Sequence, residues 1–165
     1  MNNFSDIQKK LDNLINNKSV ALVGLGNPDR ADDGFGIELT GRLKENFPDW
    51  VYSESERSVE AIVYDLLETG TFDIIIFTDA VHFKGTAGEL RIFDINDIDT
   101  FASPISTHKV PMSLLMGLIQ EQKKSSLLIG VQPVSLDFMG DMTSEVMLSL
   151  DSMETCFKKI FQGQV

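Results

Sequence analysis

The segment from Phe72 to Asp79 (FDIIIFTD) constrains the fold of this chain more than any other part of the sequence. Its apolar residues follow one another without alternation, so both faces of the strand that it forms must be covered. Strands of this kind lie in parallel sheets that carry helices on both faces. The segment therefore predicts an α/β fold with this strand at the centre of the sheet.

The rest of the chain alternates between strand and helix patterns. Compact apolar runs predict strands at 19–25, 50–52 and 125–131, and an alternating run predicts a half-exposed strand at 89–93. Helical spacing of apolar residues predicts helices at 3–17, 35–43, 58–68, 110–122 and 143–161. Joined by right-handed crossovers, these elements form a three-layer sandwich with a mainly parallel, twisted sheet flanked by helices. We expect a single domain over residues 1–165, in which residues 1–18 form an N-terminal helical extension.

The chain is strongly acidic, with 14 Lys and Arg against 25 Asp and Glu and a formal net charge of −11. This balance argues against binding to nucleic-acid phosphates and suits a basic partner or a cation, although acidity also simply favours solubility. The sequence has no apolar run of the roughly 18 residues that span a membrane. Cys156 is the only cysteine and no signal-peptide pattern precedes Asn17, so we expect a cytoplasmic protein.

Ligand sites in open α/β sheets form beyond the carboxyl ends of the strands. Three segments are expected there: the loop 24–36 after the first strand, the end of the central strand at 78–80, and Ser106-Thr107-His108 before a later helix. Two carboxylates and an imidazole can converge at this edge.

Three familiar motifs resemble parts of these segments without matching them. Gly24-Leu25-Gly26 resembles a dinucleotide fingerprint, but Asp29 replaces the third glycine and would repel a pyrophosphate. The run Gly-Leu-Gly-Asn-Pro also opens the peptidyl-tRNA hydrolases, but their Thr-Arg-His-Asn segment is absent and the net charge is wrong for tRNA. A dyad of two aspartates lacks the Asp-Thr-Gly or Asp-Ser-Gly signature of aspartic proteases.

The whole loop from Gly26 to Gly36 resembles the opening motif of the hydrogenase maturation endopeptidases, which trim the large subunit of nickel-iron hydrogenases. Further similar motifs follow in the family's order and spacing: Asp79-Ala80, Gly85, Gly88-Glu89-Leu90-Arg91, Ser106-Thr107-His108, Gly130-Val131-Gln132-Pro133 and Ser144-Glu145-Val146. The resemblance covers about residues 19–161 and implies a phosphorylase/hydrolase-like fold. Asp33 and the stretch 88–108 are most similar to the branch that serves formate-hydrogenlyase-type, energy-converting or F420-type enzymes.

The resemblance implies that Asp33, Asp79 and His108 bind nickel, or a divalent ion that substitutes for it. Two hard carboxylates and one imidazole suit such a site and leave positions open for a metal already held by a substrate. Each residue also has a structural alternative. Asp33 can stabilise the N-terminus of the following helix, Asp79 can be a partnered carboxylate at a strand end, and His108 can be an exposed loop residue.

The predicted function is therefore that of a cytoplasmic endopeptidase that removes the C-terminal extension of a nickel-loaded hydrogenase large-subunit precursor. The substrate supplies the nickel, the partner is the precursor, and we expect the protein to be a monomer. The alternative is a noncatalytic nickel-checkpoint chaperone for the same precursor, and a peptidyl-tRNA-hydrolase-like enzyme is less favoured. Nothing in the three predicted ligands separates the protease from the chaperone.

The sequence leaves a smaller role for the other polar residues near the predicted site. We expect His82 to be a loop histidine and Asn27 to order its turn. Asp29 and Asp32 either attract a basic substrate segment or are solvated loop carboxylates, and Cys156 is a packed thiol. The segment 53–57 lacks the Gly-Thr of many relatives and is a candidate for substrate choice.

Overall fold

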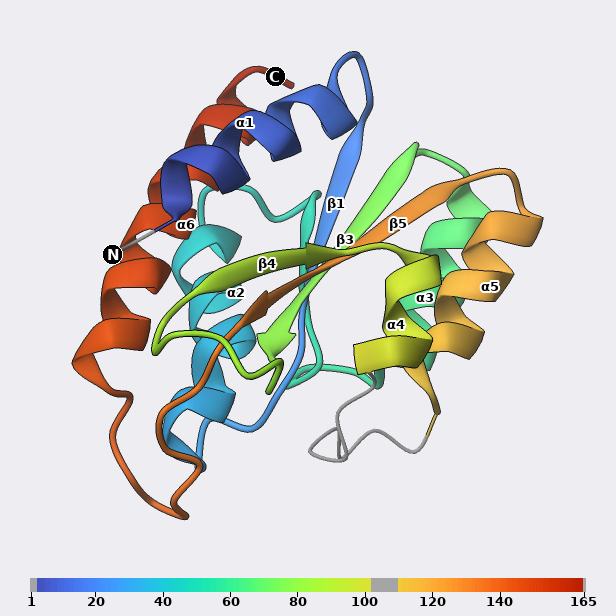
Figure 1. Cartoon of the computed structure of the whole chain (residues 1–165). Helices are drawn as coiled ribbons and strands as arrows, with labels where there is room; N and C mark the ends of the chain where they lie inside the picture. Colours follow the sequence, from blue (N-terminus) through green and yellow to red (C-terminus); the bar gives the residue numbers. More distant parts are fainter. Residues whose placement is uncertain (1–2, 102–109, 165) are drawn as a thin grey trace.

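A computed structural model describes residues 3–101 and 110–164 (Figure 1). Its five strands form one sheet in the order β2-β1-β3-β5-β4. They are β1 (Val20–Gly24), β2 (Val51–Ser53), β3 (Ile74–Ala80), β4 (Leu90–Phe93) and β5 (Ser125–Val131). β3 is the middle strand and all of its residues are buried. The predicted central position of the FDIIIFTD segment is confirmed.

Helices cover both faces of the sheet, as the sequence predicts (Figure 1). One face carries α1 (Phe4–Ile15), α2 (Phe35–Lys44) and α6 (Ser144–Gln162), and a 3₁₀ turn, η1 (Ala31–Gly34), precedes α2. The other face carries α3 (Val59–Thr69), α4 (Ile95–Phe101) and α5 (Met112–Glu121). The result is the expected α/β three-layer sandwich.

The strands direct alternate side chains into two apolar clusters, one on each face. Along β3, Ile74 and Ile76 pack towards α2 and α6, whereas Ile75 and Phe77 pack towards α3 and α5. β1 divides its side chains in the same way, because successive residues of a strand point to opposite faces. Both faces of β1 and β3 are therefore buried under apolar side chains.

β4 departs from the expectation of a half-exposed strand. It is the only antiparallel strand of the described sheet, pairing with β5, whereas β1, β2, β3 and β5 pair in parallel. Leu90, Ile92 and Phe93 are buried and only Arg91 is partly exposed. The predicted alternation is present from Glu89 to Ile92, where Glu89 and Arg91 are partly exposed, and fails at Phe93, which is buried in the opposite apolar cluster.

The N-terminal segment contacts the free edge of the sheet at β4 and continues onto one face as α1. The Asn3 side chain donates to the carbonyl oxygen of Leu90 (2.7 Å) and accepts from the Leu90 N–H (3.2 Å), as a neighbouring strand would. Ile7 and Leu11 anchor the helix in the core. An open edge can pair with another chain, and the Asn3 side chain occupies this edge at Leu90.

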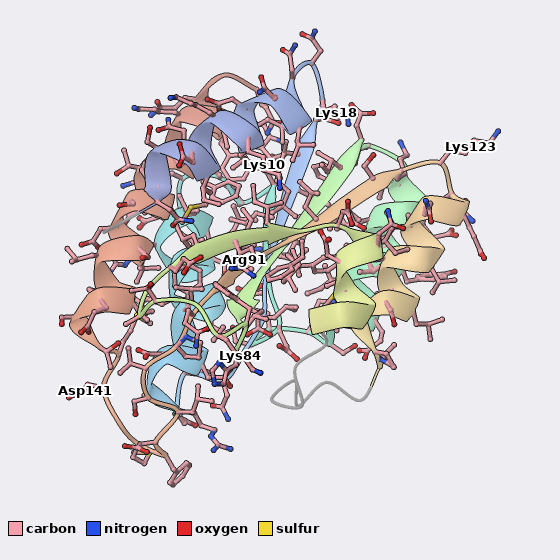
Figure 2. All side chains as sticks on the ribbon, in the orientation of Figure 1. Lys10, Lys18, Lys84, Arg91, Lys123 and Asp141 are labelled. Carbon is pink, nitrogen blue, oxygen red and sulfur yellow. The ribbon has the colours of Figure 1, made fainter. Side chains whose placement is uncertain are left out.

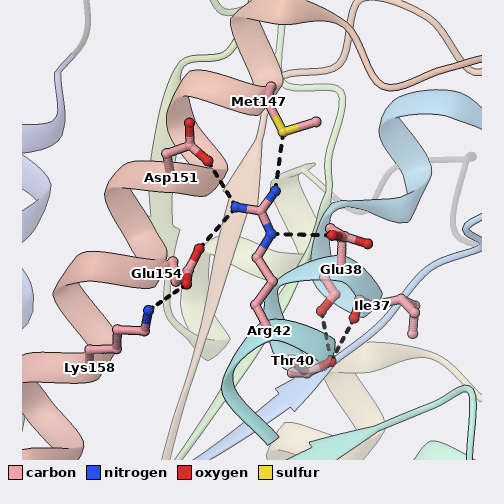
Figure 3. A network of polar contacts seen from close by, with 9 residues as sticks. Ile37, Glu38, Thr40, Arg42, Met147, Asp151, Glu154 and Lys158 are labelled. Carbon is pink, nitrogen blue, oxygen red and sulfur yellow. Dashed lines mark hydrogen bonds and ion pairs between the residues drawn. The ribbon is translucent and has the colours of Figure 1, made fainter. Parts of the chain in front are cut away.

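A polar network joins α2 to α6 on the surface (Figure 3). The Arg42 guanidinium donates to Glu38 (3.2 Å), Asp151 (2.8 Å) and Glu154 (2.9 Å), and Lys158 donates to Glu154 (2.6 Å). The two hydrogen bonds from Lys158 and Arg42 lower the pKa of the Glu154 carboxyl. Exposed pairs of this kind each contribute about 0.2–1 kcal/mol, so the network mainly sets the register of α6 against α2.

Candidate functional site

Two glycines allow the start of α2 to lie directly over the ends of β1 and β3. A Cβ atom on Gly24 would lie 2.2 Å from the Gly36 carbonyl oxygen, and one on Gly36 would lie 2.2 Å from the Thr78 carbonyl oxygen. No side chain fits at either position. This close approach brings Asp33, two residues before the helix, to the carboxyl edge of the sheet.

The Asp33 backbone and the Asp79 side chain both lie close to Gly26, which has a φ of +120°. A Cβ atom on Gly26 would be 2.0 Å from the Asp33 carbonyl oxygen and 3.1 Å from Oδ1 of Asp79. The two aspartates are only 6% and 7% exposed. Asp79 Oδ1 accepts a hydrogen bond from the Ala80 N–H (2.8 Å). The structure thus places the backbone of Asp33 and the side chain of Asp79 at the same edge of the sheet. That their carboxylates share a metal ion stays a prediction.

The third predicted ligand, His108, lies outside the described residues together with Ser106 and Thr107. Within residues 3–101 and 110–164, no three His, Cys, Asp or Glu side chains form a group that could hold a metal ion. Asp33 and Asp79 supply two carboxylates, which suit a divalent ion but leave most of its coordination positions to other ligands. The three-residue ligand set stays a prediction.

Glu54 is a third carboxylate at this edge, and the sequence analysis did not select it as a site residue. It follows β2, its N–H donates to the Gly24 carbonyl oxygen (2.9 Å), and its Oε2 accepts from the Gly26 N–H (2.9 Å). Glu54 therefore stabilises the turn at Gly26, which lies beside both Asp33 and Asp79. The rule that strand ends carry site residues could have identified it, because Glu54 comes directly after a predicted strand.

Asp32 has a role that neither sequence-based alternative foresaw. It is fully buried, so it is neither a solvated carboxylate nor free to attract a substrate. Its Oδ2 accepts from the backbone N–H groups of Val134 (2.8 Å) and Ser135 (3.0 Å), and its Oδ1 accepts from that of Thr143 (2.7 Å). The Thr143 hydroxyl also donates to the carboxylate (2.9 Å). Asp32 fastens the loop between β5 and α6 to η1.

Gln132, at the end of β5, shapes the segment that follows Asp79. Its buried side-chain oxygen accepts from the N–H groups of Phe83 and Gly85, each at 3.0 Å. Its amide nitrogen lies 2.9 Å from Nδ1 of His82, and because an amide nitrogen can only donate, Nδ1 is the acceptor. His82 is exposed in a loop, as predicted, but it is held in one orientation.

Two further expectations about single residues are confirmed. Asn27 orders its turn, since its side-chain oxygen accepts from the Asp29 N–H (2.9 Å). Cys156 is buried between α1 and α6, and burial raises the pKa of its thiol to about 11. A thiol with this pKa is protonated at neutral pH and is a poor nucleophile, so Cys156 does not serve a cysteine-protease mechanism.

No helix among the residues that the structure describes combines the length and the apolar character needed to cross a membrane. This agrees with the hydropathy of the sequence.

Known proteins resemble this chain in both sequence and structure. The Hydrogenase 3 maturation protease of Escherichia coli is 27% identical over 143 residues, which are 84% of this chain and 86% of that protein. The hydrogenase expression/formation protein HoxM of Azotobacter vinelandii is 30% identical over 141 residues, covering 81% and 67% of the two chains. The crystal structure of a [NiFe] hydrogenase maturation protease, HycI from Thermococcus kodakarensis, superposes with a TM-score of 0.78 at 28% identity, covering 93% and 99% of the chains.

The family comparison agrees with these pairwise similarities. The sequence profile described as hydrogenase maturation protease (HycI) matches residues 59–160, which is more than half of the chain. The matched part includes β3 with Asp79, the strands β4 and β5, and most of α6. The chain therefore belongs to the family of hydrogenase maturation proteases, which are peptide-bond hydrolases.

Proposed function

We propose that this protein is the endopeptidase that removes the C-terminal extension from a nickel-loaded precursor of a nickel-iron hydrogenase large subunit. The observation that carries the proposal is that two buried aspartates, Asp33 and Asp79, both lie beside Gly26 at the carboxyl edge of the sheet in a member of this protease family. Carboxylate oxygens are suitable ligands for a divalent ion, so these two residues can contact a metal that arrives with the substrate.

The nickel ion belongs to the substrate in this proposal. Asp33, Asp79 and His108 are the residues expected to contact it, because two carboxylates and an imidazole form an incomplete ligand set. A metal shared between enzyme and precursor would fix the position of the scissile peptide bond and can polarise its carbonyl group. A precursor without nickel would lack this contact, so the enzyme would cut only after the metal has been inserted.

Glu54, which follows β2, stabilises the turn at Gly26 next to these two aspartates. By accepting from the Gly26 N–H, it stabilises the positive-φ conformation of Gly26, the glycine that lies against both Asp33 and Asp79. We assign it a positioning role. Its neighbours in the segment 53–57, which is largely exposed, remain our candidates for substrate choice.

The experiment that tests the function is incubation with the purified nickel-loaded precursor, followed by measurement of the precursor's mass. Loss of a C-terminal fragment identifies the endopeptidase. Stable binding without any change in mass would instead identify the nickel-checkpoint chaperone. Asp79→Asn tests the site, and Asp49→Asn, which changes an exposed aspartate outside the site loops, is the matched control.

We further propose that the protein works as a cytoplasmic monomer and serves a hydrogenase of the formate-hydrogenlyase, energy-converting or F420 type. The single cysteine, a free buried thiol, is consistent with a reducing compartment. The contact of Asn3 with Leu90 supports a monomer, because it occupies one of the outward-facing pairing positions of β4.

A further inference from the structure

The loop between β5 and α6 carries an exposed apolar patch. It projects from the end of the molecule at which α2 begins (Figure 1). Phe138 and Met139 are 75% and 73% exposed, and Val134 is 54% exposed. Isolated exposed apolar side chains are common on proteins, but adjacent large ones on one projecting loop are typical of an interaction surface.

The loop is held firmly, so its exposed side chains do not result from a loose conformation. Asp32 accepts from Val134 and Thr143 near its two ends, and the Met139 N–H donates to the Asp29 carbonyl oxygen at 2.6 Å. Met139 also adopts a φ of +60°, which is unfavourable for a residue with a side chain. The fold thus maintains a conformation that presents Phe138 and Met139 to solvent, and such preorganisation lowers the entropy cost of binding.

Carboxylates surround the apolar patch. Asp29, Asp137 and Asp141 are all exposed, and Asp141 lies on the outside of the molecule (Figure 2). Arg30, next to Asp29 in the sequence, uses its Nε to donate to the Leu136 carbonyl oxygen (3.3 Å). The surface therefore fits a partner that offers an apolar depression bordered by Lys or Arg side chains.

The patch and the candidate site share one edge of the sheet. The loop leaves β5 at its carboxyl end, and the buried Asp32 that holds it is the residue before Asp33. A Cβ atom on Gly140 would lie 3.4 Å from that of Ala31, so the loop packs on the segment that leads to the site. One partner can contact the patch and the site at the same time.

We propose that Val134, Phe138 and Met139 form a docking surface for the folded body of the hydrogenase precursor, distinct from the segment that is cut. The inference rests on the proposed function and adds a second contact to it. The metal selects precursors that are ready to be processed, whereas the docking surface supplies affinity for the body of the precursor. The precursor would present an apolar depression with basic residues at its margin.

Steady-state kinetics on the nickel-loaded precursor test this. The variant combines Phe138→Ser with Met139→Asn, because asparagine tolerates the positive φ at position 139. Its KM should rise about tenfold or more, while kcat stays within about twofold. Asp137→Lys should also raise KM. Tyr64→Ser removes a comparably exposed side chain, 63% exposed, on the opposite helical layer and should change neither constant. An unchanged KM in the double variant would overturn the proposal.

Photo-crosslinking separates this inference from the proposed function. A benzoylphenylalanine side chain at position 138 should crosslink to the body of the precursor, and the same group at position 64 should not. Crosslinking from 138 without any cleavage would retain the docking surface and reject the protease function. Cleavage without crosslinking from 138 would reject the docking surface and retain the function. Neither crosslinking nor cleavage would reject both.

Discussion

Replacing Asp32 by Asn should destabilise the protein severely, although the two side chains have nearly the same shape. One carboxylate oxygen accepts from the N–H groups of Val134 and Ser135, and the other accepts from the N–H and the hydroxyl of Thr143. An amide keeps one acceptor and presents N–H groups at the other position. One or two buried backbone N–H groups must then face a donor.

The expected loss in the free energy of unfolding follows from the number of hydrogen bonds that the substitution removes. Each hydrogen bond to a charged acceptor contributes about 1.5–3 kcal/mol, so the loss should be about 2–5 kcal/mol in the free energy of unfolding. For a domain of this size that corresponds to a fall of roughly 5–15 °C in Tm. The whole stability of a typical domain is about 5–15 kcal/mol, so the variant should still fold but only marginally.

Guanidinium unfolding followed by Trp50 fluorescence measures this loss. Trp50 stacks on Phe161 with ring centroids 5.8 Å apart, so its emission reports on the packing of α6. Asp29→Asn is the control, because Asp29 is exposed and should change stability by less than about 0.5 kcal/mol. A loss below about 1 kcal/mol in the Asp32 variant would refute the assignment of Asp32 as the anchor of the loop.

Four further results are expected. Asp79→Asn should lower precursor processing by orders of magnitude, because a neutral amide oxygen is a poorer metal ligand, and it should not lower Tm. His82→Gln should leave processing within a few-fold, and mass measurement of the precursor checks both variants. Gly26→Ala should abolish processing, since its Cβ would clash with the Asp33 carbonyl oxygen at 2.0 Å, and circular dichroism distinguishes this local effect from unfolding. Native Cys156 should react with iodoacetamide at pH 8 at least about a hundredfold more slowly than in denaturant, because its thiol has a pKa of about 11. The protein alone should bind divalent metal weakly, and tight nickel uptake in calorimetry would contradict the incomplete ligand set.

The sequence predicted the layers, the central strand and most element boundaries because those features depend on local periodicity. β3 needed no partner to be identified, since an unbroken apolar run already demands cover on both faces. The burial of the edge strand β4 and its antiparallel pairing with β5 were harder to predict. The burial of Phe93 depends on tertiary packing in the second apolar cluster, where its ring centroid lies 5.7 Å from that of Phe83.

The short helix α4 was missed although the sequence carries its signal. Asp94 accepts from the N–H groups of Asn96 (2.8 Å) and Asp97 (3.1 Å), and Asp97 accepts in return from the Asp94 N–H (3.0 Å). This reciprocal arrangement is a capping box with an aspartate in the place of the usual glutamate. A search for that pattern would have placed a helix start after Asp94.

At the candidate site, the position of two residues relative to the strands identified them: Asp33 lies in the loop after β1, and Asp79 is the residue before the last in β3. Asp32 could not be assigned in this way, since its partners lie more than 100 residues further along the chain. Glu54 is intermediate: its place after β2 was visible in the sequence, but its bond to Gly26 depends on the fold of the turn. Local patterns identify which residues reach the edge, and tertiary contacts decide what each one does there.

The most direct test of the account compares two forms of one precursor, loaded with nickel and free of nickel, in separate incubations with the wild-type protein. The mass of the precursor's C-terminus is measured over time. The account predicts that the nickel-loaded form loses its C-terminal extension and that the nickel-free form stays intact. Equal cleavage of both forms, or no cleavage of the loaded form, would contradict it.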